Sequence, residues 1–137
     1  MPERSKQALS DAHWISRALA RWWLSVAVVL GLVIIVGGAI RWTGPAYADA
    51  LTYPYAPASW GITLCTIGMV GLAGSLFRRL RVVAISLGVL AVWCLFFALS
   101  FYTVARTNPT AGTTGIPIYL GVAVNALVLA VGHWRNG

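Results

Sequence analysis

The chain has 137 residues, of which 59% are hydrophobic and 9% are charged, with a formal net charge of +7. Soluble domains carry about 25% charged residues, and a soluble fold of this length cannot bury so much apolar surface. The composition therefore excludes an ordinary soluble domain and predicts one all-α membrane domain. The basic residues lie in short clusters between apolar runs, which favours contact with anionic lipid headgroups and argues against a nucleic-acid partner.

Residues 1–21 precede the first apolar run and form a leader with two faces. Small and apolar residues recur there at alternating intervals of four and three: Ala8, Ala12, Ile15, Leu19 and Trp22. A polar stripe occupies another face: Lys6, Ser10, His13, Arg17 and Arg21. This pattern predicts an amphipathic helix that either lies in the plane of the membrane surface or extends the first span into the cytoplasm.

Four apolar segments follow, each with the roughly 20 residues that a helix needs to cross a bilayer. Within the membrane domain, residues 22–134, the predicted spans are residues 22–41, 59–77, 82–105 and 116–134. We expect helices, because the runs are continuous and a membrane strand would alternate polar and apolar residues. The very short connection between the second and third spans predicts that these two form a tight antiparallel hairpin. We expect the four helices together to form two antiparallel hairpins, with residues 135–137 as a cytoplasmic tail.

The basic residues indicate the orientation of these spans. Two of them, Arg41 and Arg106, lie on one side. The other eight lie on the opposite side: Arg4, Lys6, Arg17, Arg21, Arg78, Arg79, Arg81 and Arg135. The positive-inside rule therefore predicts a multi-pass protein of the inner (cytoplasmic) membrane with both termini in the cytoplasm.

Tryptophan and tyrosine favour the headgroup level, so their positions provide an independent check on the spans. Three aromatic residues fall at predicted inner ends: Trp22, Trp23 and Trp134. Four fall at predicted outer ends: Trp42, Trp60, Tyr102 and Tyr119. Trp93 alone lies in the middle of a span, and we expect it to pack against other helices rather than to bind a ligand.

Small residues mark the faces through which helices can approach closely in lipid. The candidates are Gly37, Gly38, Gly68, Gly71, Gly74, Ser75, Ala84, Gly88, Ala126 and Ala130. We interpret them first as packing positions inside one four-helix bundle and second as contacts between copies of the chain. Asn125 is the strongly polar side chain near mid-membrane. We expect it to bond internally, to Thr63, Thr66 or Ser86, although it could instead face a pore or a neighbouring subunit.

Chemically reactive side chains are few and scattered. Glu3, Asp11 and Asp49 do not pair by local spacing, and His13 and His133 lie at membrane edges, where contact with water or headgroups is expected. Cys65 and Cys94 lie inside apolar runs, as small hydrophobic side chains do, with no spacing that suits zinc or a disulfide. The sequence therefore predicts no enzyme, no metal site and no cofactor.

Three stretches carry a family resemblance. They are Pro57-Ala-Ser-Trp60-Gly61, the segment from Ala91 to Ser100, and the segment from Asn108 to Tyr119. Over residues 55–125 the chain resembles small four-span membrane proteins of actinobacterial phages, some encoded near lysis genes and called holin-like. The resemblance implies oligomerisation in the inner membrane and timed permeabilisation that lets an endolysin reach the cell wall, with no catalytic residues.

Two other functions remain open at this stage. An accessory or scaffolding subunit of a larger membrane complex would need no active site of its own and would dock through its small-residue faces. A small channel or transporter would line a path with Asn125 and the threonines of the second span. That third hypothesis is the weakest, because the predicted spans hold no ionisable residue in their interiors.

Overall fold

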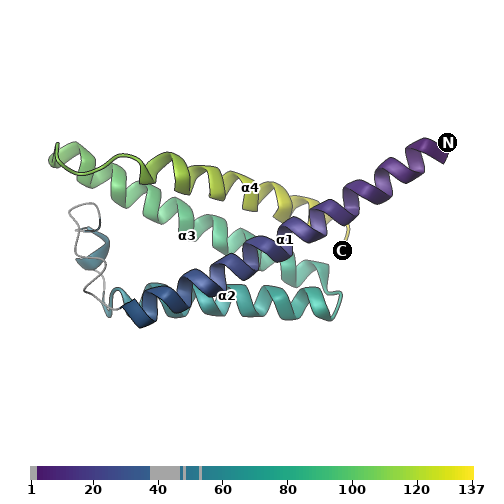
Figure 1. Cartoon of the computed structure of the whole chain (residues 1–137), viewed down its shortest axis with the longest axis horizontal. Helices are drawn as coiled ribbons and strands as arrows, with labels where there is room; N and C mark the ends of the chain where they lie inside the picture. Colours follow the sequence, from purple (N-terminus) through teal and green to yellow (C-terminus); the bar gives the residue numbers. More distant parts are fainter. Residues whose placement is uncertain (1–2, 38–46, 48, 53) are drawn as a thin grey trace.

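The computed structural model describes residues 3–37, 47, 49–52 and 54–137 (Figure 1). Its elements are α1 (Glu3–Gly37), the short 3-10 helix η3 (Ala50–Thr52), α2 (Ala58–Leu76), α3 (Leu80–Thr107) and α4 (Gly115–Arg135). The regular structure of these described residues is entirely helical, and four helices are long and apolar enough to cross a membrane. The predicted all-α fold is confirmed. The predictions for Gly38 and Trp42 lie outside the described residues.

The helices pack as two antiparallel hairpins. Helix α1 runs along α2, α3 runs along α4, and α2 also contacts α3, whereas α1 touches α3 and α4 only sparingly (Figure 1). Both chain ends and the turn between α2 and α3 lie at one end of the bundle (Figure 1). We call this the arginine end, because the turn contains Arg78 and Arg79, and Arg81 follows it.

Helix α1 joins the leader to the first span without a break. Its 35 residues correspond to about 52 Å at 1.5 Å per residue, well beyond the ~30 Å of a hydrocarbon core. The N-terminal turns project past the other helices (Figure 1). No glycine or proline occurs between Glu3 and Leu30, so nothing in the sequence interrupts the helix. Of the two arrangements expected for the leader, the structure has the extension of the first span.

The polar stripe of the leader lies in line with the face of α1 that packs on the bundle. The buried residues of α1 are Ala20, Leu24, Ala27, Gly31 and Ile34, which follow alternating intervals of four and three. Continuing that alternation toward the N-terminus leads to Arg17 and His13. Their side chains therefore emerge on the bundle side of α1, below its last buried turn, whereas Ile15, Leu19 and Trp22 are exposed on another face.

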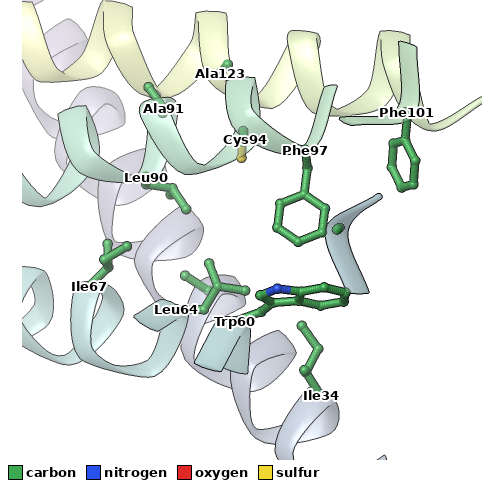
Figure 2. Close-up of a cluster of buried hydrophobic side chains, with 13 residues drawn as sticks. Ile34, Trp60, Leu64, Ile67, Leu90, Ala91, Cys94, Phe97, Phe101 and Ala123 are labelled. Atoms are coloured by element: carbon green, nitrogen blue, oxygen red, sulfur yellow. The ribbon is translucent and has the colours of Figure 1, made fainter. Parts of the chain in front are cut away.

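The core has one aromatic and one aliphatic part. The aromatic part centres on Phe97 and includes Trp60 and Phe101, with Leu64, Leu90 and Ile34 packed around it (Figure 2). The aliphatic part lies toward the arginine end and consists of Ala20, Leu24, Val83, Leu87 and Ala130. The first part links all four long helices, and the second links α1, α3 and α4.

The turn between α2 and α3 is closed by backbone hydrogen bonds. Arg79 N donates to Gly74 O (2.8 Å) and Arg78 N donates to Ser75 O (3.2 Å), the bonding pattern of a Schellman motif. Arg78 occupies the left-handed position of this motif with a φ of 54°, where glycine is the usual residue. An L-residue in this conformation costs about 1–2 kcal/mol.

The Arg78→Gly substitution is therefore expected to raise the free energy of unfolding by roughly 1 kcal/mol, because it removes backbone strain and loses no described contact. Thermal unfolding in detergent measures the change. Arg79→Gly is the matched control, since Arg79 has a φ of −90° and gains nothing from glycine. A less stable Arg78→Gly protein than Arg79→Gly protein would contradict this interpretation of the turn.

Candidate functional site

The described part of the bundle interior contains few polar side chains. Among the described residues, the buried polar side chains are Ser86, Ser100 and His133. Thr63 and Thr66 are exposed and donate to carbonyl oxygens of their own helix, Ser59 O (2.7 Å) and Ile62 O (2.8 Å). These threonines therefore do not line a channel inside one copy of the protein.

Asn125 lies on the outer surface of α4, at the midpoint of this 21-residue helix. Its Nδ2 donates to Gly121 O one turn earlier (2.9 Å). The expected bond to Thr63, Thr66 or Ser86 is therefore wrong. The physical reason is the rotation of α4, which packs through Ala123, Ala126 and Ala130 and turns Asn125 away from the bundle.

The surface of α4 around Asn125 is open. Val124 and Val128 beside it are exposed, as is Gly121. A methyl group added at Gly121 or at Gly132 would meet no atom within 4 Å. This face therefore combines a polar amide with space for another helix to approach.

Helices α1 and α2 approach through glycines, some of which the sequence analysis did not single out. A Cβ on Gly61 would lie 2.6 Å from Gly31 O, and a Cβ on Gly31 would lie 2.6 Å from Gly61 O. Gly68 was predicted as a packing residue, and a Cβ added to it would likewise lie 2.6 Å from Leu24 O. Gly31 and Gly61 lie in different spans, so no local spacing could reveal the pair.

The other predicted small residues divide into buried and open positions. Gly71 and Gly74 are buried where α2 meets Leu24 and Val82, respectively. Ala84, Ala126 and Ala130 are buried as expected. Gly88 has open space around it, and Gly37 is half-buried at the end of α1. Ser75 accepts a hydrogen bond from Arg21 Nε (2.7 Å), which ties α2 to the leader.

Two aromatic residues at the predicted outer ends of spans point into the bundle. Trp60 is 5% exposed, and its ring lies 5.0 Å from that of Phe97 (Figure 2). Its Nε1 has no hydrogen-bond partner within the described part of the chain. Tyr119 is half-buried with its ring 5.4–5.5 Å from Phe101 and Phe97. The aromatic core attracts both rings, because ring pairs add to simple packing.

The remaining aromatic residues lie partly in the core and partly on the surface of the bundle. Trp93 stacks on Phe97 with 4.2 Å between ring centroids, which confirms its packing role. Trp22, Tyr102 and Trp134 are exposed, and Trp23 is half-buried. Outside the long helices, the ring centroid of Tyr47 lies 6.3 Å from that of Trp60 and 5.1 Å from that of Phe101. Burial raises the pKa of the Tyr47 phenol.

The predicted basic residues gather at the arginine end. Arg17, Arg21, Arg78, Arg79, Arg81 and Arg135 are all exposed. The guanidinium of Arg81 lies 5.8 Å from the centre of the Trp134 ring. This pair connects α3 to the end of α4. Cys65 and Cys94 are both free thiols.

Comparison with known proteins adds no family to these observations: no family, curated protein or solved structure matches the chain. The fold and the surfaces described above therefore carry the functional argument.

Proposed function

We propose that this protein assembles laterally with copies of itself in the cytoplasmic membrane and acts there as a holin-like permeabilising or lysis-regulating protein, without catalysis. In this proposal the arginine end, with both termini, lies in the cytoplasm, because it holds eight of the ten basic residues. Anionic headgroups of the inner leaflet surround it.

The observation that supports self-assembly is the exposed amide of Asn125 at the middle of α4. One of its N–H groups bonds to Gly121 O, and its oxygen and second N–H make no bond to the described residues. Lipid tails supply no such partners, so an unpaired amide is costly in hydrocarbon. A second Asn125 supplies both a donor and an acceptor.

The neighbouring surface suits such a contact. Gly121 lies one turn from Asn125 and has open space around it, so a second α4 can approach to short range. An interhelical hydrogen bond of this kind contributes about 0.6–2 kcal/mol. Larger assemblies would place several amides together at the middle of the bilayer, where they would admit water more readily than the apolar core of one chain does.

The proposal is tested by inducible expression in bacteria with equal amounts of protein in the membrane. Wild-type protein is expected to arrest growth and collapse the membrane potential, and Asn125→Leu is expected to lose about threefold to thirtyfold in that activity, the equivalent of one interhelical bond of about 0.6–2 kcal/mol. Val124→Leu is the matched control, because it changes the adjacent exposed side chain without removing an amide.

Asn125→Gln keeps the amide and should retain most of the activity. Normal growth and potential with abundant wild-type protein would sink the holin-like function. Chemical cross-linking in the membrane addresses assembly separately. Ladders of the chain itself support the proposal, whereas recovery only with stoichiometric unrelated proteins would favour an accessory subunit of a larger complex.

A further inference from the structure

A small cavity lies at the arginine end, where the leader passes the other helices. It has a volume of about 20 Å³ and is lined by His13, Ser16, Arg17, Leu80, His133 and Asn136. An open groove of about 580 Å³ shares four of these residues and adds Ser10 and Trp14. We propose that the cavity and groove together bind a phosphate group, and specifically that of an anionic phospholipid.

His133 is the buried polar group of this cavity. It is 4% exposed, and its Nδ1 lies 2.8 Å from Leu129 O. A carbonyl oxygen can only accept, so Nδ1 carries the proton of this bond, and Nε2 is left without a protein partner. Nε2 is not fully enclosed by protein, so it opens on the cavity and can bond to a ligand there.

The start of α3 adds a second set of donors. Leu80, the first residue of α3, lines both the cavity and the groove. The preceding residue, Arg79, makes no side-chain hydrogen bond that would cap the helix. Val82 N and Val83 N both donate to Arg79 O, which leaves the amides of Leu80 and Arg81 without an acceptor among the described residues, at the positive end of the helix dipole. Phosphate groups bind at such positions.

The charged side chains that line these hollows are all basic, and Gly137, the last residue of the chain, lies in the adjoining hollow close to Arg81 N. Arg17 lines the cavity, and Arg78, Arg79 and Arg81 line an adjoining hollow that shares Leu80 and Asn136 with it. Among the described residues that line these three hollows, none is acidic. A bound anion therefore relieves repulsion among the guanidinium groups, and a guanidinium pairs with phosphate through two parallel hydrogen bonds.

The dimensions and the neighbours favour a lipid as the source of the phosphate. A volume of about 20 Å³ holds about one water-sized group, so one phosphate oxygen enters the cavity and the rest of the group occupies the groove. Trp14 lines the groove, and Trp134 lies nearby under Arg81. Both indoles are largely exposed, as expected beside the glycerol region of a membrane.

The site is separate from the Asn125 surface, so its test does not depend on self-assembly. Protein is purified in mixed micelles with equal amounts of phosphatidylglycerol and phosphatidylcholine, and native mass spectrometry counts the lipids retained. Wild-type protein is expected to retain one phosphatidylglycerol per chain. Arg17→Gln should reduce retention about tenfold, which corresponds to one charge-assisted hydrogen bond.

Arg135→Gln is the matched control, because Arg135 is exposed at the same end, carries the same charge and lines none of the three hollows. Its effect should stay below about twofold, as for an exposed charge. Equal losses in the two variants would overturn the site and leave only diffuse attraction. The test uses the exposed Arg17 because replacing the buried His133 would also disturb packing.

A comparison with inorganic phosphate shows whether the bound phosphate group belongs to a lipid. Thermal unfolding is measured in neutral detergent with millimolar phosphate or with phosphatidylglycerol. Stabilisation by the lipid alone, lost in Arg17→Gln, supports the full proposal. Equal stabilisation by inorganic phosphate would support the phosphate chemistry and overturn the lipid assignment. No stabilisation by either would overturn both.

Discussion

Replacing Gly61 by valine is expected to loosen the contact between α1 and α2 and to lower the thermal unfolding temperature in detergent sharply. A Cβ at this position would lie 2.6 Å from Gly31 O and 2.6 Å from Ile35 Cγ1. The first of these atoms belongs to the backbone of a helix, which cannot rotate away as a side chain can. Forcing extra atoms into a packed interface costs about 1–3 kcal/mol, and contact with backbone favours the upper end.

The effect is large because apolar burial does not hold helices together in lipid. Close packing and hydrogen bonds do so instead, and the Gly31–Gly61 approach brings two backbones into direct contact. The measurement is the thermal unfolding temperature, together with disulfide trapping between cysteines placed on α1 and α2. Both should fall sharply in Gly61→Val, and Gly31→Val should behave in the same way.

Gly88→Val is the matched control, since it makes the same substitution in a long helix at a position with no atom within 4 Å. It should leave both measurements nearly unchanged. Equal losses in Gly61→Val and Gly88→Val would mean that valine disturbs the helices themselves and that the glycine contact is not special.

The membrane spans could be read from the sequence because lipid permits few alternatives. Backbone groups in hydrocarbon must bond within the segment, so a long uncharged run becomes a helix. The predicted second span, residues 59–77, differs by one residue at each end from α2 (Ala58–Leu76). The N-terminal segment also fits this logic, since no residue breaks the helix before the first span.

The rotation of each helix could not be read in the same way. In a soluble helix the polar face marks the outside, but lipid-facing and buried surfaces in these spans are both apolar. Asn125 was therefore expected to bond inside the bundle although α4 turns it outward, and the positions of Trp60 and Tyr119 at the outer ends of their spans did not reveal that both rings turn into the core. Polarity within a span does not indicate which side meets the bundle.

Contacts between residues far apart in the sequence also could not be predicted. Gly31 and Gly61 are 30 positions apart, and His13 and His133 are 120 positions apart, yet each pair meets in the folded chain. No periodicity links such residues. The leader supplied a partial signal, because its stripe of His13 and Arg17 has the same alternating spacing as the buried face of α1. That continuity places the basic residues beside the bundle rather than away from it.

Replacing Phe97 by alanine is expected to lower the free energy of unfolding by about 3 kcal/mol, near the low end of the range for buried phenylalanines. Phe97 is 1% exposed and lies at the centre of the aromatic core, with ring centroids of Trp93 and Trp60 at 4.2 and 5.0 Å (Figure 2). Lipid reduces the transfer contribution, but the lost ring pairs and the cavity remain.

Phe77→Ala removes the same atoms from an exposed position at the end of α2, so it isolates the contribution of the core. Its unfolding temperature in detergent should stay close to that of the wild type, whereas Phe97→Ala should unfold well below it. Because Phe97 contacts rings from α2 and α4, its loss should also loosen both hairpins, and proteolysis between α3 and α4 should accelerate. Equal unfolding temperatures for the Phe97→Ala and Phe77→Ala variants would mean that the aromatic core does not hold the helices together.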